Sequence, residues 1–405
     1  MTMNAHAGQL GKKVKRVALV GLNNFNNIGD QIISETTEYL IRECGVEGIE
    51  PYFVDMNPYD SYCREYLKVP FYSSNLIGKL QKPFSKLPNG EALGYWAEYT
   101  SSRVKLFHYY KTWLNGADAI IFTGGAFIKY QTQGLNYLID LLTEIADDMG
   151  IPVMMSAMGV EGYSEEDIRC QKLKAAINRP CVKKITVRDD YELLRDKYMS
   201  NTDITIRAVG DPAFWIPECY RITKNPQDIV GVGVIRSDNF RRYGIDFSES
   251  DVIRLYQEII QSLEQNGMPW KLFSNGLTSD YKFGLELLDS LGYSPEDKFV
   301  PRPVSTAELL DTLKMFKGVI AARLHACISA YALDIPTVGL VWNEKLTQFG
   351  RLFIKEEFFS PVIHLTGEKV VAKLKEALDF QYDRDKRQEW REATKAELEA
   401  FLQSI

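Results

Sequence analysis

Short apolar runs alternate with longer amphipathic segments along most of the chain. The runs "RVALVG" (16–21), "ADAIIFTGG" (117–125) and "IPVMMSAMGV" (151–160) are typical of buried strands, and a polar or glycine-rich turn and a segment of helical periodicity follow. Two more runs, at 183–190 and 204–215, continue the series. Strands that alternate with helices at this spacing predict a parallel sheet with helices on both faces.

The alternation restarts after a proline-marked segment, "IPECYRITKNPQ" (216–227). The second series of predicted strands lies at 228–238, 269–276, 298–303, 318–323 and 336–342. The chain of 405 residues is long enough for two cores. We therefore expect an α/β protein with two Rossmann-like domains, at 1–217 and 225–370, which face each other across a cleft, and a helical tail at 371–405 that caps one of them.

Residues 56–113 depart from this pattern because they are rich in aromatic residues, prolines and lysines and lack a clean period. One interpretation is an irregular insertion with one or two helices. The other is a lobe that binds an acceptor or faces a membrane, since lysines are interleaved with aromatic residues there (Lys79, Lys82, Lys86, Phe71, Tyr72, Phe84).

Composition narrows the class of protein. The formal net charge of −6 argues against a dedicated nucleic-acid binder, which normally carries a basic excess. The six cysteines form no C-x-x-C and no metal-type pairing with histidine, so we expect no metal site and no cofactor. No stretch reaches the roughly 18 apolar residues of a spanning helix, and the start lacks a signal core. We expect a soluble, cytoplasmic protein, with contact at the inner face of the membrane left open.

Glycine turns follow three predicted strands of the first half. In "VGLNNFNNIGDQII" (20–33), Asp30 is placed to cap a helix predicted over 31–44. A helix start with free N–H groups is a ready site for an anion or polyol, although a well-capped turn explains the pattern equally well. The turns "FTGGAFIKYQTQG" (122–134) and "SAMGVEGY" (156–163) repeat the arrangement at the next strand ends.

The second half carries its candidate chemistry at strand ends as well. Arg236 lies just past a buried strand, and "AARLHACISAYALDIPTVGLVW" (321–342) places Arg323 and His325 where a strand turns into a helix. Arginine offers a planar fork for phosphate or carboxylate, and the helix start favours an anion. Lys345 follows the last predicted strand and is expected to reach the same cleft.

The motifs "NNIGD", "TGGAF", "VRDDYELL", "GDPAF", "ARLHACISAYALDIPTVGL" and "NEKLTQF", in this order, resemble the polysaccharide pyruvyl transferase family. The resemblance implies a fold similar to that of GT-B glycosyltransferases. It also implies transfer of a pyruvyl group from phosphoenolpyruvate onto two hydroxyls of a sugar, which gives a cyclic ketal and releases phosphate. Thr123 stands where the family often has the first of three glycines.

The resemblance gives the candidate residues their expected roles. An anionic donor needs fixed cations, and the predicted phosphoenolpyruvate-binding set is Arg323, His325, Arg236 and Lys345. His325 is either the proton donor or a phosphate partner, because its ordinary pKa lies near working pH. The predicted set for the acceptor, a polysaccharide or its lipid-linked precursor, is Asn27, Gly29, Asp30, Thr123, Gly124 and Gly125, with Asp30 as a base.

The sequence leaves two other functions open. It also leaves open whether the protein forms a homo-oligomer. A GT-B glycosyltransferase using a nucleotide sugar would share the fold, although no glutamate pair eight apart lies near residue 340. A non-catalytic scaffold that binds sugar or phosphate is the other alternative. A scaffold would tolerate His325→Ala, whereas a transferase would lose turnover with its fold intact.

Overall fold

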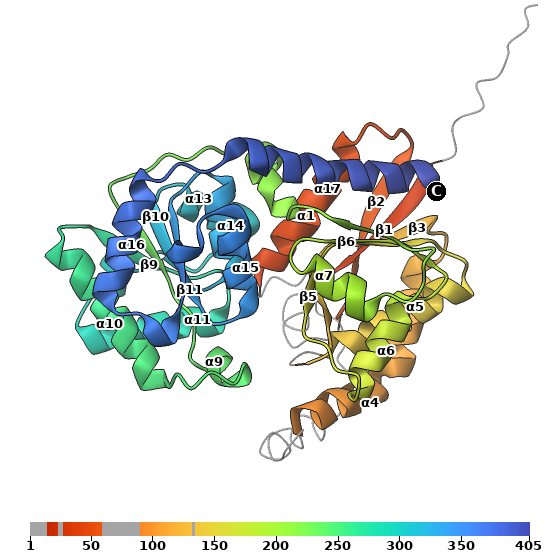
Figure 1. Ribbon diagram of the computed structural model, residues 1–405, viewed down its shortest axis with the longest axis horizontal. Coiled ribbons are helices and arrows are strands. Elements are labelled where there is room, and N and C mark those ends of the chain that lie inside the picture. The colour runs from red at the N-terminus through yellow and green to blue at the C-terminus, as the bar shows by residue number, and fades with distance from the viewer. Residues whose placement is uncertain (1–13, 23–26, 59–89, 132–133) are drawn as a thin grey trace, which may run out of the picture.

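The computed structural model describes residues 14–22, 27–58, 90–131 and 134–405. Its first domain is built on a parallel sheet of seven strands in the order β2-β1-β3-β5-β6-β7, with β4 pairing along β5 (Figure 1). The strands are β1 (Lys15–Gly21), β2 (Ile49–Asp55), β3 (Ala119–Phe122), β4 (Gly125–Lys129), β5 (Val153–Glu161), β6 (Val182–Val187) and β7 (Thr205–Ala208). The helices are α1 (Ile28–Glu43), α4 (Gly90–Leu114), α5 (Leu135–Asp148), α6 (Ile168–Ile177), α7 (Tyr191–Leu193) and the π-helix η1 (Leu194–Tyr198).

The second domain has a parallel sheet of five strands in the order β12-β11-β10-β8-β9. These are β8 (Val230–Gly233), β9 (Trp270–Phe273), β10 (Gly318–Ala321), β11 (Thr337–Val341) and β12 (Phe359–Pro361). Its helices are α9 (Asp238–Arg242), α10 (Glu249–Gln265), α11 (Thr278–Leu291), α12 (Pro295–Lys298), α13 (Thr306–Leu313), α14 (Leu324–Ala332), α15 (Glu344–Phe353), η3 (Glu356–Phe358), η4 (Val362–His364) and α16 (Gly367–Asp379). Helices η2 (Pro212–Trp215) and α8 (Ile216–Cys219) link the domains, and α17 (Arg384–Ser404) ends the chain.

Strand order reverses once in each sheet, and the reversal marks where a ligand can bind. In the first sheet, β1 lies between β2 and β3, so the connections after β1 and after β3 leave in opposite directions. In the second sheet the same reversal lies between β8 and β10. Open parallel sheets bind their ligands outside the carboxyl ends of the strands at such switch points. The predicted site residues Asn27, Thr123, Arg236 and Arg323 all follow one of these four strands closely.

Burial of both sheet faces explains the apolar runs of the sequence. In β1, for example, Val17, Ala18 and Leu19 have no exposed surface, as expected for strands covered by helices on both sides. Helix α1 joins the two cores, because its first turns contribute Ile28 and Ile32 to the core of the second domain. Its last turns pack Leu40 and neighbouring side chains beneath the first sheet.

Helix α17 returns from the second domain to the first. Figure 1 shows it crossing the top of the molecule toward β1 and β2. Leu398, Phe401 and Leu402 are buried there in one cluster with Val17 and Leu19. The last helix therefore fastens the end of the chain to the first domain, so the tail contacts more than the domain that precedes it.

The structure corrects two details of the glycine turns. Helix α1 begins at Ile28 rather than at residue 31, so Asp30 lies in its first turn and Asn27 is the N-cap residue. The expectation that Asp30 caps this helix was therefore wrong. The run predicted as one strand at 117–125 is also interrupted, since β3 ends at Phe122 and β4 begins at Gly125. Gly124 and Gly125 make this break with φ angles of +96° and +106°.

Other strand predictions fail at the sheet edges. Residues 298–303 form no strand and only a single bridge between Leu272 and Phe299. The edge strands β2 and β12 were not predicted, because both carry proline and β2 also carries charged residues. An edge strand tolerates proline where a central strand does not.

Part of the irregular region is helical. Helix α4 covers Gly90–Leu114 and projects from the first domain (Figure 1). The interleaved lysines and aromatic residues on which the lobe interpretation rests (Lys79, Lys82, Lys86, Phe71, Tyr72, Phe84) lie outside the described residues. Among the residues that the structure describes, no helix is long and apolar enough to cross a membrane.

Candidate functional site

The two domains meet where the start of α1 touches the start of α14. Gly29 lies so close to His325 that an added Cβ atom would be 2.5 Å from the imidazole Nδ1. Only glycine allows this approach, because a Cβ atom at that distance would overlap the ring. The contact brings residues from both switch points into one site, with Asp30 on one side and His325 on the other.

His325 is held in its neutral form by its surroundings. It lies in the first turn of α14 and is buried, with its Nε2 3.4 Å from Arg188 Nη1 and 3.9 Å from Asp211 Oδ2. Burial lowers the pKa of His325 to about 4, and the Arg188 charge lowers it further than Asp211 can restore. At neutral pH the imidazole is therefore uncharged, and its Nε2 accepts a hydrogen bond from the Arg188 guanidinium.

Arg188 is a site residue that the sequence analysis missed. It follows the buried strand β6, forms an ion pair with Asp211 and is itself buried. Asp211 also accepts a hydrogen bond of 2.9 Å from the Ala213 backbone N–H, so this carboxylate caps η2. The signal was available, since Arg188 directly follows an apolar run as Arg323 does. It was hidden because the motif "VRDDYELL" is typical of a helix cap followed by a charged face.

Asp30 has the electrostatics of an acid–base group. Its Oδ2 accepts a hydrogen bond of 2.8 Å from the Asn27 side chain. Burial raises the pKa of Asp30 to about 6, against the opposing effects of Arg188 and of the Asn27 hydrogen bond. A carboxyl group whose pKa is this high can hold or release a proton near neutral pH. Asp189, a partly buried neighbour of Arg188, also has a raised pKa because of burial.

Arg323 is oriented by Asp280, which sequence reasoning also missed. The guanidinium donates from Nε and Nη2 to the two carboxylate oxygens of Asp280, at 2.7 and 2.8 Å. Asp280 is fully buried in the first turn of α11, and it also accepts a bond of 3.2 Å from the Arg236 backbone N–H. The two arginines predicted from separate strands thus share one carboxylate. The N–H groups on Nη1 and the second N–H of Nη2 are not used in this bidentate pair.

Lys345 contacts the first domain directly. Its Nζ lies 2.6 Å from Glu161 Oε2, at the end of β5. The other oxygen of Glu161 is 2.9 Å from the Nζ of Lys129 on β4. Burial works to raise the pKa of Glu161, but Lys345 and Lys129 outweigh it and lower the pKa overall. One carboxylate therefore joins lysines from both domains.

The "TGG" turn has a packing role in this structure. The Thr123 hydroxyl is buried and lies 2.9 Å from the hydroxyl of Ser34 on α1. A Cβ atom at Gly124 would lie 2.7 Å from the Ile33 side chain, and one at Gly125 would meet Phe127. These contacts explain why small residues stand here. Acceptor binding by Thr123, Gly124 and Gly125 stays a prediction.

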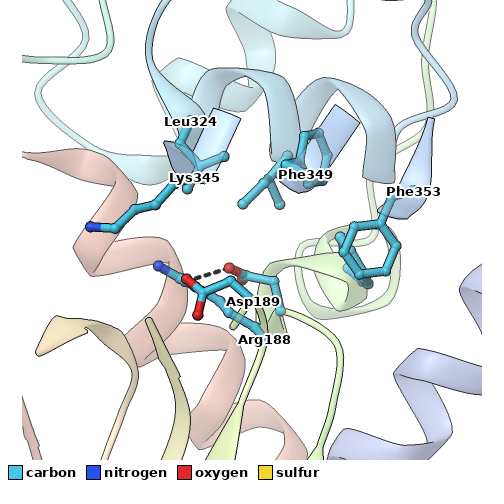
Figure 2. Close-up of a pocket in the computed structure, with 9 residues that line it drawn as sticks. Arg188, Asp189, Leu324, Lys345, Phe349 and Phe353 are labelled. Atoms are coloured by element: carbon cyan, nitrogen blue, oxygen red, sulfur yellow. Dashed lines mark hydrogen bonds and ion pairs between the residues drawn. The ribbon is translucent and has the colours of Figure 1, made fainter. Parts of the chain in front are cut away.

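A small pocket, partly open to solvent, lies between the domains. Figure 2 shows Lys345 above Arg188 and Asp189 at its polar end, with Phe349 and Phe353 along the other wall. The complete lining is Arg188, Asp189, Asp211, Phe214, Leu324, Ile328, Lys345, Phe349 and Phe353. The pocket therefore has a charged end and an apolar wall. Among the described residues, no group of three or more His, Cys, Asp or Glu side chains could hold a metal ion.

Comparison with known families decides what kind of protein this is. The model of the polysaccharide pyruvyl transferase family matches residues 27–344 and so covers most of the chain. The chain belongs to this family. The polysaccharide pyruvyl transferase family indicates a transferase that acts on a sugar or polysaccharide, and its match begins at Asn27 and ends at Glu344, next to Lys345. No curated protein sequence matches the chain significantly.

Solved structures share the fold of this polysaccharide pyruvyl transferase family member. The Methanocaldococcus jannaschii UDP-GlcNAc 2-epimerase with UDP-GlcNAc and UDP matches at a TM-score of 0.53 and 13% identity, covering 91% of this chain and 94% of that chain. The Neisseria meningitidis UDP-GlcNAc 2-epimerase bound to UDP-GlcNAc matches at a TM-score of 0.56 and 9% identity, covering 96% and 100%. At these identities the likeness shows the fold alone, which is GT-B-like with two Rossmann-like domains.

Proposed function

We propose that this protein transfers the pyruvyl group of phosphoenolpyruvate onto two hydroxyls of a sugar, forming a cyclic ketal and releasing phosphate. The observation that carries the proposal is the contact between Gly29 and His325 in a member of this family. It brings a carboxyl group with a pKa near neutral, Asp30, into one site with the imidazole and a set of fixed cations.

The second domain supplies what an anionic donor requires. The start of α14 presents the positive end of a helix dipole, and Arg323 adds a charged fork that Asp280 holds in place. Arg236 is joined to the same carboxylate through its backbone, and Lys345 lines the cavity. Bidentate binding of a phosphate by an oriented arginine loses little side-chain entropy, because the ion pair with Asp280 has already fixed the side chain.

The electrostatics suggest how His325 can take both of its expected roles. With a pKa of about 4, the imidazole is neutral before the donor binds and donates one hydrogen bond. A phosphate placed beside it would raise the pKa of His325, because the protonated form is then stabilised by the neighbouring negative charge. The protonated imidazole delivers its proton to the methylene carbon of the donor, and a cationic carbon forms that bears the phosphate.

Asp30 is the proposed base on the acceptor side. Its pKa of about 6 leaves it ionised at neutral pH, so it can remove the proton of the attacking hydroxyl. The sugar oxygen bonds to the cationic carbon, and the carbon–oxygen bond to phosphate then breaks. The second hydroxyl adds to the same carbon and gives its proton to His325, which is neutral again after the first step, and the ring closes. The apolar wall of the cavity suits the methyl group that the donor gains.

A glycosyltransferase or epimerase that uses a nucleotide sugar is the alternative. It is favoured only by the fold shared with UDP-GlcNAc 2-epimerases. The two functions differ in the donor, so the donor is what an experiment must identify.

Incubation of the protein with cell-envelope glycans and phosphoenolpyruvate labelled in its carbon chain tests the proposal. We expect the label to enter the glycan with release of phosphate, and a mass gain equal to pyruvate less water. The matched control is the same reaction with His325→Ala, which is expected to transfer no label. Transfer from a labelled UDP-sugar instead would replace the proposal with the alternative.

A further inference from the structure

Glu161 lies between two lysines that come from different domains. Lys129 and Glu161 are paired in the register of β4 and β5, so their side chains leave the first sheet side by side. Lys345 approaches from the first turn of α15 in the second domain. Each lysine Nζ faces a different oxygen of the Glu161 carboxylate, at 2.9 and 2.6 Å. The two ammonium groups therefore form a site shaped for one carboxylate.

Lys129 is already directed toward the second domain. Its Nζ donates a hydrogen bond of 2.5 Å to the Tyr243 hydroxyl and lies 4.4 Å from the centre of that ring. Only 3% of the Lys129 side chain is exposed. Burial lowers the pKa of Lys129, and Glu161 opposes this shift. A buried ammonium of this kind needs an anion beside it, and in this structure Glu161 is that anion.

Glu161 is the carboxylate of the site that a ligand can displace most easily. Three carboxylates neutralise cations here: Asp211 pairs with Arg188, Asp280 with Arg323, and Glu161 with the lysines. The two aspartates also accept backbone hydrogen bonds, which fix them within their own domains. Their side chains are 3% and 0% exposed, whereas the Glu161 side chain is 21% exposed. Within the described residues, the two lysines hold the Glu161 carboxylate.

We propose that Lys129 and Lys345 together bind the carboxylate of the donor, and that Glu161 holds its place until the donor enters. This inference rests on the proposed function, because it assumes a donor that carries a carboxylate beside its phosphate. It makes Lys129 a donor-binding residue contributed by the first domain, on the side expected to bind the acceptor. A donor held this way bridges both domains.

Calorimetric titration with phosphoenolpyruvate, of wild type, Lys129→Met and Glu161→Gln, tests the inference. Loss of one charge-assisted contact should weaken the binding of Lys129→Met by about tenfold or more. Glu161→Gln should bind more tightly than wild type, because the internal competitor has lost its charge. If Glu161 only fastened the domains together, both variants would bind more weakly, and that result would overturn the inference. Unchanged binding by Lys129→Met would overturn it too.

Controls separate the inference from the proposed function on which it rests. Lys184→Met breaks a Lys–Glu pair of 2.5 Å with Glu397, outside the site, and should leave the affinity unchanged. In Lys129→Met, pyruvate should compete less well with phosphoenolpyruvate for binding, whereas inorganic phosphate should compete as it does in wild type. The reverse pattern would assign the lysines to the phosphate and refute the carboxylate assignment. Failure of the wild-type protein to bind phosphoenolpyruvate would refute the proposed function itself. If thermal unfolding shows that Lys129→Met does not fold, Glu161→Gln alone decides.

Discussion

At the scale of single residues, the proposed mechanism depends most on His325. Replacement by alanine or glutamine is expected to lower kcat/KM by about 10²–10⁴-fold, the usual contribution of a positioned acid or base. Glutamine can still donate a hydrogen bond to phosphate but cannot carry the proton, so it should not restore turnover. Steady-state kinetics on both variants measures this. Substantial activity in His325→Gln would mean that the residue binds phosphate and another group carries the proton.

The pKa of Asp30 predicts how activity depends on pH. With a pKa of about 6, the carboxyl is protonated below pH 6 and cannot act as a base. The kcat/KM of wild type should therefore fall about tenfold per pH unit below about pH 6. Asp30→Asn should lower the plateau and remove this acidic limb. The pH profiles of the two proteins, with thermal unfolding at each pH to confirm folding, measure the effect; a limb that persists in Asp30→Asn would assign it to another group.

The sequence marks several residues of the candidate site, and there is a physical reason why it does not mark the others. Arg323, His325 and Asp30 stand out as charged or ionisable residues beside apolar runs, which is unusual enough to mark them. Lys129 and Glu161 lie in glycine turns that the sequence marks, but their ion pair could not be predicted, and neither could the pairing of Asp280. Their roles come from contacts over long sequence separations, such as Asp280 with Arg323, which no local pattern encodes.

At the scale of elements, the start of α1 is the critical segment. Gly29→Ala would place a methyl group 2.5 Å from His325 Nδ1 and force α1 away from α14. We expect a loss of stability of about 1–3 kcal/mol, typical of overpacking, together with a large loss of activity. Chemical denaturation and kinetics measure the two effects. Glu38→Ala is the matched control on the same helix, because the Glu38 side chain is 26% exposed and forms an ion pair with Arg42 of that helix. Wild-type activity in Gly29→Ala would contradict the close contact.

Helix α17 gives a second prediction at this scale. Leu398 is fully buried against the first sheet, so Leu398→Ala should cost about 2–5 kcal/mol by leaving a cavity. Denaturant unfolding measures the loss, and Glu399→Ala on the same helix should change stability little. Equal stability of Leu398→Ala and wild type would show that α17 does not hold the first domain as the structure has it.

The predicted elements were most accurate where burial is complete. Central strands such as β1 and β10 contain an uninterrupted buried apolar run bounded by polar residues, so their patterns are unambiguous. The edges failed because β2 and β12 are short or half-exposed and their sequences carry proline. The start of α1 was placed three residues late, because its first turn packs Ile28 against the second domain and no local pattern encodes that contact.

At the scale of the whole molecule, the domains are joined by polar contacts as well as by apolar packing. Arg188 of the first domain lies 3.4 Å from His325 of the second, and Glu161 contacts Lys345 across the same gap. Each cation named in these pairs already has a carboxylate partner in this structure. When an anionic donor binds in the cleft, we therefore expect these cations to exchange their carboxylate partners for the donor.

Calorimetric titration of wild type and Arg323→Ala with phosphoenolpyruvate, beside UDP-GlcNAc, tests the central claim most directly. Wild type is expected to bind phosphoenolpyruvate and not the nucleotide sugar. We also expect Arg323→Ala to lose about tenfold or more in affinity, the value of a charge-assisted contact. Binding of UDP-GlcNAc alone, or phosphoenolpyruvate binding that is unchanged in Arg323→Ala, would contradict the account.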